Sequence, residues 1–294
     1  MKERNEKAKP KQKKKEKERE PQYFRSVTGD KTMNYRVYYM SALEKIVYFV
    51  LAFVVGAAIG YLFYGGIGKD EYGDPTTLTH ILNAGIMVSC GLVAGKLFLP
   101  VRNQQIQRAR QGKLKSQFRD MLEALSTSLG SGKNVPESFQ AAYIDLENQY
   151  EEGAFILREL KIINNGVVNG INIEELIEDF GKRSGCPDIE DFAGVFEVCY
   201  RRGGNIRDTI QNTCHIIVDK MAVAQEIETT VTGSKNEQYI MLVLPVLLVG
   251  MIKMSSPEFA ANFVTPSGII ATTIAIGLFV ASYFVGRKLL DIKV

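Results

Sequence analysis

The sequence predicts an all-α integral membrane protein in which four transmembrane helices, arranged two plus two, flank a cytoplasmic helical-bundle domain. Two observations lead to this fold class. Four uncharged stretches approach or exceed the length of a membrane-crossing helix, and they form two pairs on either side of a polar middle region. That middle region repeats apolar residues at spacings of three and four, the pattern of amphipathic helices.

Residues 1–40 are expected to form a disordered, basic cytoplasmic tail. The first twenty residues contain ten Lys or Arg against five Glu and almost no aliphatic side chain, so burial cannot offset the entropy lost on ordering them. Basic tails beside membranes meet anionic lipid headgroups. We therefore expect membrane lipids, and no nucleic acid, as partners of this tail.

Residues 41–100 are expected to form a transmembrane hairpin of two spans. The first uncharged run extends from Ile46 to Gly68 and the second from Pro75 to Gly95, and both reach the roughly 20 residues that a helix needs to cross the hydrocarbon core. Each run carries a pair of glycines in small-xxx-small spacing, which favours close helix packing. The pairs are Gly56 with Gly60 and Gly91 with Gly95.

Residues 237–294 are expected to form a second hairpin of two spans that ends in a short cytoplasmic C-terminus. The third span, uncharged only from Gln238 to Ile252, must borrow a turn from its flanks, and Pro245 should kink it. The uncharged residues between Glu258 and Arg287 suffice for a fourth, tilted span.

The distribution of charge predicts the orientation. The loop between the first two spans is acidic, whereas the segment after the second span carries six Lys or Arg before its first acid, Asp120. The positive-inside rule therefore places the N-terminus, the middle region and the C-terminus in the cytoplasm. No signal peptide is expected, because the first hydrophobic run is too long and lacks a small-residue cleavage site.

The middle region, residues 101–236, is expected to form about six amphipathic helices. One apolar stripe runs from Leu114 to Leu129, and Asn134 with Pro136 and Asn172 with Glu175 are expected to open later helices. A central turn should follow, in which two glycines end one helix and an asparagine caps the next. The turn residues are Gly203, Gly204 and Asn205, and the helix from Ile206 is expected to continue into the third span.

Motifs that carry chemistry are weak. Gly130-Ser-Gly-Lys133 lacks the Ser or Thr, the leading glycine and the preceding strand of a phosphate-binding loop. The adjacent pair Cys214-His215 does not have the spacing of metal ligands. We therefore expect no enzyme, no cofactor and no metal. A transporter also ranks low, since no ionisable residue lies deep within a span.

Charged residues of the middle region are the candidates for docking a partner. They form an acidic stretch and a later arginine group, which can bind a partner of opposite charge or can simply be solvated helix faces. The acidic candidates are Glu174, Glu178, Asp179, Asp188 and Asp191, and the basic candidates are Arg201, Arg202 and Arg207.

Three motifs, taken in order, resemble the type II secretion system F domain family. A helix ends in Leu129-Gly-Ser-Gly-Lys-Asn-Val-Pro-Glu-Ser-Phe139, a later segment reads Gly170-Ile-Asn-Ile-Glu-Glu-Leu176, and Arg202-Gly-Gly-Asn-Ile206 precedes the long helix. A single such domain between two pairs of spans is similar to the TadB and TadC proteins of tight-adherence (Flp) pilus systems. The resemblance covers about residues 100–286. Val135-Pro136 departs from the family, in which Leu is frequent at this place.

The resemblance implies a platform protein of the bacterial inner membrane. Such proteins couple a cytoplasmic secretion ATPase to the extraction of pilin subunits from the bilayer and to filament assembly. The expected partners are that ATPase, pilin subunits and a second F-domain membrane protein, in a homo- or hetero-oligomer. The alternative is a membrane-anchored scaffold or sensor that docks a cytoplasmic regulator.

Overall fold

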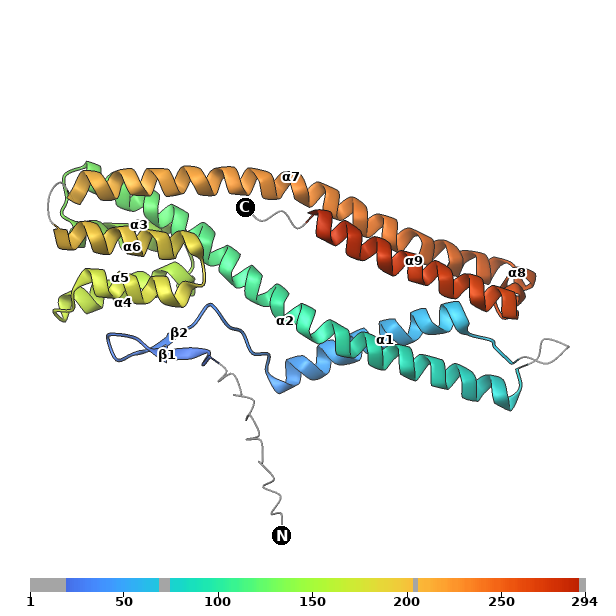
Figure 1. Cartoon of the computed structure of the whole chain (residues 1–294). Coiled ribbons are helices and arrows are strands. Elements are labelled where there is room, and N and C mark those ends of the chain that lie inside the picture. The colour runs from blue at the N-terminus through green and yellow to red at the C-terminus, as the bar shows by residue number, and fades with distance from the viewer. Residues whose placement is uncertain (1–19, 69–74, 203–205, 291–294) are drawn as a thin grey trace, which may run out of the picture.

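The computed structural model describes residues 20–68, 75–202 and 206–290, and over these ranges it is mostly helical (Figure 1). Two short strands come first, β1 (Tyr23–Arg25) and β2 (Lys31–Met33). The helices follow in the order α1 (Ala42–Tyr64), α2 (Thr77–Gly130), α3 (Val135–Gln149), α4 (Phe155–Val168), α5 (Ile173–Ser184), α6 (Pro187–Arg202), α7 (Ile206–Ser255), α8 (Pro257–Asn262) and α9 (Pro266–Leu290).

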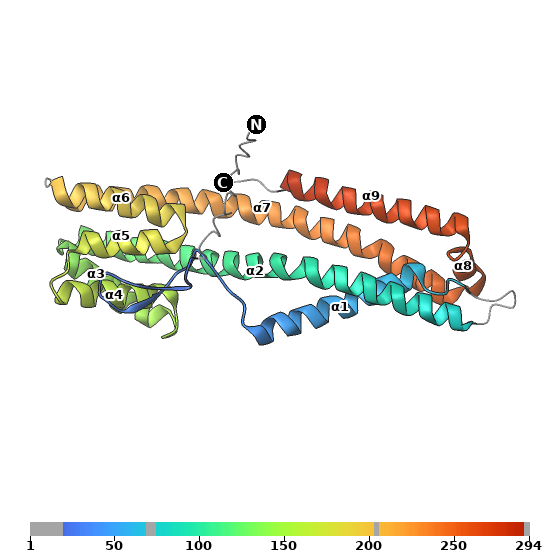
Figure 2. The same cartoon turned by 60° about the horizontal axis from the view of Figure 1, so that its bottom comes forward.

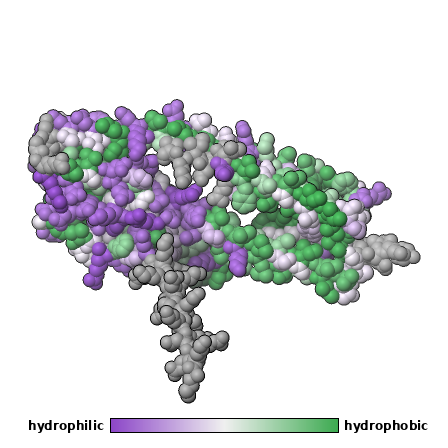
Figure 3. All heavy atoms as spheres, in the orientation of Figure 1, coloured by the Kyte–Doolittle hydropathy of each residue, from purple (hydrophilic) through white to green (hydrophobic). Residues whose placement is uncertain are grey.

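The described chain is elongated and has two chemically different ends. Helices α3–α6 gather at one end with the C-terminal part of α2 and the N-terminal part of α7, whereas α1, α8 and α9 lie toward the other end (Figures 1 and 2). The surface is mainly hydrophilic around the bundle and mainly hydrophobic at the far end (Figure 3). We call the first end the bundle, meaning α3–α6 and the adjoining parts of α2 and α7.

Helices α1, α2, α7 and α9 each contain a stretch that is long and apolar enough to cross a membrane. Large apolar side chains on these stretches are exposed, for example Leu51 of α1 and Leu247 of α7. A run of exposed apolar residues around a helix is stable when lipid surrounds it. The structure thus agrees with a mostly helical fold that has four helices able to span a membrane, while their insertion and orientation stay predictions.

The α1–α2 pair packs through its small residues. A Cβ atom added to Gly91 or to Gly95 of α2 would lie 2.6 Å from the ring of Phe53 or Phe49 of α1. On the α1 side, a Cβ atom on Gly60 would lie 2.8 Å from Cβ of Cys90. The predicted role of these glycines in close packing is confirmed, because any larger residue would force the helices apart.

Aromatic and leucine side chains fill the core of the bundle. Leu114, Phe118 and Leu125 of α2 are each fully buried, as the predicted stripe requires. The ring of Phe118 meets Phe192 of α6 edge-to-face, with 5.6 Å between the ring centroids. Burial of such side chains is the main favourable contribution to the stability of this part of the chain.

Two helices connect the bundle to the apolar end without a break. The 50-residue α7 confirms the predicted continuity from Ile206 into the third span. The 54-residue α2 runs through Pro100, although the sequence indicated a domain boundary there. The change from apolar to charged residues near Pro100 marks a change of surroundings for one continuous helix and does not mark its end.

The helix caps agree with the sequence in one case and differ in the other. Asn134 caps α3, and its side chain accepts from the backbone N–H of Glu137 at 2.9 Å. Asn172 precedes α5 as predicted, but its side chain makes no cap bond to the backbone. It donates instead to the carboxylate of Glu175 at 2.9 Å, so the two side chains satisfy each other.

The prediction of a disordered segment through residue 40 is wrong for residues 20–40. Strands β1 and β2 form an antiparallel hairpin in which Phe24 pairs with Thr32, and Gly29 supplies the positive φ of +82° in the turn. Tyr35, just after the hairpin, is only 3% exposed. Buried side chains such as Tyr35, Tyr38 and Met40 supply the burial that orders this segment. The predicted turn Gly203-Gly204-Asn205 lies outside the described residues.

Replacement of Phe118 by Ala should destabilise the bundle by about 3–5 kcal/mol, because it removes a buried ring and leaves a cavity among α2, α5 and α6. The thermal unfolding midpoint of the full chain in detergent micelles measures the effect. Val168→Ala is the matched control, since this α4 side chain is 86% exposed. Equal midpoints for the two variants would contradict the assigned core.

Candidate functional site

A buried carboxylate joins the two long helices to the bundle. Asp188 lies in the first turn of α6 directly after Pro187, and its side chain is 6% exposed. It forms two ion pairs, one with Nζ of Lys115 on α2 at 2.9 Å and one with Nζ of Lys220 on α7 at 2.8 Å. We call Lys115, Asp188 and Lys220 the charge clamp.

The clamp keeps Asp188 ionised. Burial opposes ionisation of this carboxyl, but hydrogen bonds from Lys220 and Lys115 outweigh burial and hold its pKa below the ordinary value. The lysines remain half-exposed or exposed, with 37% and 57% of their side chains accessible. The result is a single negative charge that attracts one cation from each long helix.

Further polar contacts join α2 and α7 beyond Lys115, toward the C-terminal end of α2. Arg119 donates from Nη1 to Oε1 of Gln225 at 3.0 Å, and Oγ of Ser126 lies 3.1 Å from Nε2 of His215. These contacts repeat along the antiparallel pair, so α2 and α7 are held side by side over several turns within the bundle.

A second group of charges lies inside the bundle, between α4 and α5. Arg183 of α5 is 3% exposed and forms a two-pronged ion pair with Glu159 of α4, with N···O distances of 3.1 and 2.8 Å. Its Nε donates to Asp179 at 2.8 Å. Although burial alone lowers an arginine pKa, the hydrogen bonds and charges of Glu159 and Asp179 raise the pKa of Arg183. The guanidinium therefore stays charged.

The β1–β2 hairpin is attached to the bundle through this group. The Arg183 guanidinium donates to the backbone carbonyl of Met33 at 3.1 Å, and the Tyr35 hydroxyl donates to Glu159 at 2.9 Å. Ser26 donates to Asp179 at 3.1 Å. Burial, together with the Glu159 charge, raises the pKa of Tyr35 well above its ordinary value. We call Tyr35, Glu159, Asp179 and Arg183 the buried ion network.

Two of the predicted docking residues are internal. Asp188 belongs to the charge clamp and Asp179 to the buried ion network, so neither offers its charge to a partner. Our expectation of one exposed acidic surface is therefore wrong for these two positions. Sequence spacing could not reveal that these two acids are paired inside the protein, because they alternate with apolar residues in the same way as the exposed acids do.

The other docking candidates are more accessible. Glu178 is partly exposed and pairs with Lys182, and Glu174 is half-buried at the start of α5. Asp191 is 64% exposed and lies 3.4 Å from Lys220. Arg201 is 59% exposed and pairs with Glu197 at 3.1 Å.

Arg207 lies apart from this group. Its side chain is exposed and donates to the carbonyl of Gly132 at 3.0 Å. The side chain of Arg202 is outside the described part of the structure.

Sequence reasoning missed Lys115, Glu159, Arg183 and Lys220. One signal was available for Glu159, since it stands three residues after Ile156 and four before Ile163, on the buried face of α4. A charged residue inside an apolar stripe indicates a buried partner. Nothing comparable marks Lys115 and Lys220, which are ordinary lysines in polar stretches.

In the described ranges, no three His, Cys, Asp or Glu side chains gather as metal ligands would. The thiol of Cys186 is buried, and burial raises its pKa to about 11, so it remains protonated at neutral pH. The charge clamp and the buried ion network hold helices together and orient them.

The chain matches no protein-family model, no curated protein and no solved structure. The interpretation of the charge clamp and the long helices therefore rests on geometry and sequence.

Substitution of Asp188 by Asn should lower stability by about 2 kcal/mol at neutral pH, because it removes a charged acceptor shared by two lysines. Folding lowers the pKa of this carboxyl, so its ionised form stabilises the folded state at every pH above its unfolded pKa, near 4. This stabilisation is lost as the pH falls through the pKa of the folded state. Thermal midpoints of the wild type and the variant should therefore converge below about pH 4. Glu190→Gln, on the exposed side of α6, is the control. A constant gap at all pH values would contradict the clamp.

Substitution of Arg183 by Met should cost about 3–5 kcal/mol, because it leaves the carboxylate of Glu159 buried and uncompensated. Adding Glu159→Gln to this variant should restore part of the loss by removing the buried charge. Trypsin cleavage after Arg25 and Lys31 reports hairpin release and should accelerate in the single variant. If the double variant is less stable than Arg183→Met, the buried charge is not the cause.

Proposed function

We propose that this chain is a membrane platform that transmits movement of a cytoplasmic bundle to four membrane-spanning helices. One observation supports this most directly: α2 and α7 run unbroken from the bundle into apolar stretches, and Asp188 binds a lysine of each. Both helices keep a helical backbone through Pro100 and Pro245, so a displacement of the bundle end is carried along them into the apolar stretches.

The movement enters at α6. Asp188 opens this helix, so a shift of α6 pulls on Lys115 and Lys220 and thereby on both long helices. The exposed residues Asp191 and Arg201 lie on the same helix and can receive a partner through charge. The site performs no chemistry of its own and needs an external source of work.

We propose that a secretion ATPase supplies this work in a type II secretion or tight-adherence pilus machine. The order of the three sequence motifs supports that assignment. The chain would then sit in a bacterial inner membrane, with both termini cytoplasmic, beside a second F-domain protein. Its movement would help pilin subunits leave the bilayer and join a filament. An ATPase that co-purifies from native membranes, and a prepilin encoded nearby, would separate this role from a scaffold or sensor.

The function predicts that breaking α7 between bundle and membrane uncouples them. Thr232 is exposed within α7. A proline in a helix interior destabilises the helix by about 3 kcal/mol, and each 1.4 kcal/mol changes an equilibrium constant by about tenfold. Thr232→Pro should preserve membrane insertion and ATPase binding but reduce filament assembly by about tenfold or more. Thr232→Ala, the matched control, should assemble normally.

Each outcome of this experiment is informative. Normal assembly by Thr232→Pro would refute transmission through α7. Loss of ATPase binding in Thr232→Pro would mean that the bundle itself depends on this part of α7. If native membranes yield a regulator and no ATPase, the scaffold alternative replaces the platform.

A further inference from the structure

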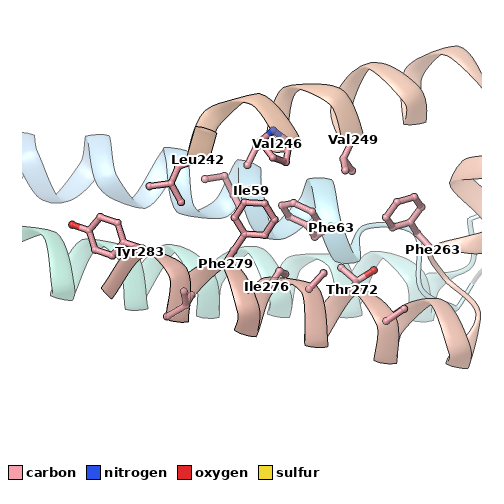
Figure 4. Close-up of a pocket in the computed structure, with 14 residues that line it drawn as sticks. Ile59, Phe63, Leu242, Val246, Val249, Phe263, Thr272, Ile276, Phe279 and Tyr283 are labelled. Carbon is pink, nitrogen blue, oxygen red and sulfur yellow. The ribbon is translucent and has the colours of Figure 1, made fainter. Parts of the chain in front are cut away.

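An apolar cavity of about 600 Å³ lies among three of the helices that are able to span a membrane. Ile59 and Phe63 of α1 form one wall, α7 forms a second around Pro245, and α9 forms the third (Figure 4). Figure 4 shows Phe263 at one end of the cavity and Tyr283 at the other.

The dimensions of the cavity restrict what can fill it. The α9 residues that line it extend from Ala271 to Tyr283, which corresponds to about 18 Å at about 1.5 Å per residue. One leaflet contributes about 15 Å to the hydrocarbon core. A transmembrane helix about 10 Å wide and 30 Å long occupies on the order of 2,000 Å³, so it cannot lie inside the cavity. A slender hydrocarbon chain can.

The chemistry of the walls agrees with a hydrocarbon occupant. Apart from Thr272 and Tyr283, the lining side chains are aliphatic or phenylalanine, so water gains few hydrogen bonds there. The cavity opens to the surface, since Ile59, Phe279 and Val280 of its lining are exposed. Surrounded by lipid, such a space fills with acyl chain, because empty space beside apolar side chains forfeits dispersion contacts.

A positive charge lies at the end marked by Phe263. The ammonium of Lys253 is 4.7 Å from the centroid of the Phe263 ring and donates to the carbonyl of Leu62 at 2.6 Å. A phosphate bears the complementary charge. This end therefore suits a lipid headgroup, while the remainder of the cavity suits the chain below it.

We propose that the cavity holds one acyl chain of a membrane phospholipid, with its phosphate toward Lys253. The chain packs against Leu242, Pro245 and Val249 of α7. Pro245 lacks the N–H that would complete the hydrogen bonding of this turn, and the acyl chain contacts the turn through apolar packing alone. This inference is independent of any pilus role, since it depends only on the spans and the cavity.

Photochemical labelling tests the proposal on the purified full chain. The probe is a phosphatidylglycerol with a diazirine in one acyl chain, placed in vesicles of phosphatidylethanolamine and phosphatidylglycerol. After irradiation, mass spectrometry of peptides should find the adducts on cavity residues such as Phe63, Val246 and Phe279.

Filling the cavity supplies the decisive variant. Ala275 and Ala281 of α9 are both exposed, but only Ala275 lines the cavity. The ring of Ala275→Phe should displace about two CH₂ groups of the lipid chain from the cavity. Each buried CH₂ contributes about 0.8 kcal/mol, so cavity labelling should fall about tenfold. Ala281→Phe, an identical change on another face of α9, should leave labelling unchanged. Equal labelling in both variants overturns the proposal.

A second measurement covers the case in which Ala275→Phe fails to fold. Native mass spectrometry of the wild type, released gently from detergent, should retain one phospholipid per chain. Lys253→Gln should reduce labelling by phosphatidylglycerol more than labelling by a phosphatidylcholine probe. A wild type that retains no lipid, or cavity crosslinks to a second copy of the chain or to a co-purified membrane helix, refutes an acyl-chain site.

Discussion

The carboxylate of Asp188 is the point on which the arrangement of long helices depends. An ionised carboxyl removed from water must find compensating charge, and here that charge comes from α2 and α7 together. Because each lysine belongs to a helix that continues into an apolar stretch, the electrostatic requirement of one side chain fixes the starting position of two helices that are able to span a membrane. The hydrophobic core of the bundle then sets the distance at which those helices run.

The buried ion network performs a different task, because its charges select a register more than they add stability. A buried pair such as Arg183–Glu159 gains little over well-packed apolar residues. It nevertheless requires the Met33 carbonyl and the Tyr35 hydroxyl at defined places. A shift of this segment by one residue would move the Met33 carbonyl away from Arg183 and the Tyr35 hydroxyl away from Glu159, which would leave Glu159 with fewer donors. The network therefore specifies one docking of the hairpin among several that apolar contacts alone would tolerate.

Periodicity and charge predicted much of the fold, because both are properties of local sequence. The stripe from Leu114 to Leu129, the continuity of α7 and the glycine contacts of α1 and α2 all follow from spacing alone. The predictions that were wrong concern residues whose burial depends on partners distant in the sequence. Asp188 and Asp191 look alike in the sequence, yet one is buried between two lysines and the other faces solvent. The hairpin was missed because its burial depends on aromatic residues that meet α4 and α5 only after folding.

The attachment of the hairpin also imposes an order on biosynthesis. The contact from Tyr35 to Glu159 joins residues 124 positions apart, and the contact from Ser26 to Asp179 joins residues 153 apart. At about 5–20 residues per second on the ribosome, Tyr35 waits about 6–25 s for Glu159 to be made. Helices α1 and α2 are both translated within that interval. The N-terminal strands therefore dock onto a bundle that the ribosome completes after the α1–α2 pair has already emerged.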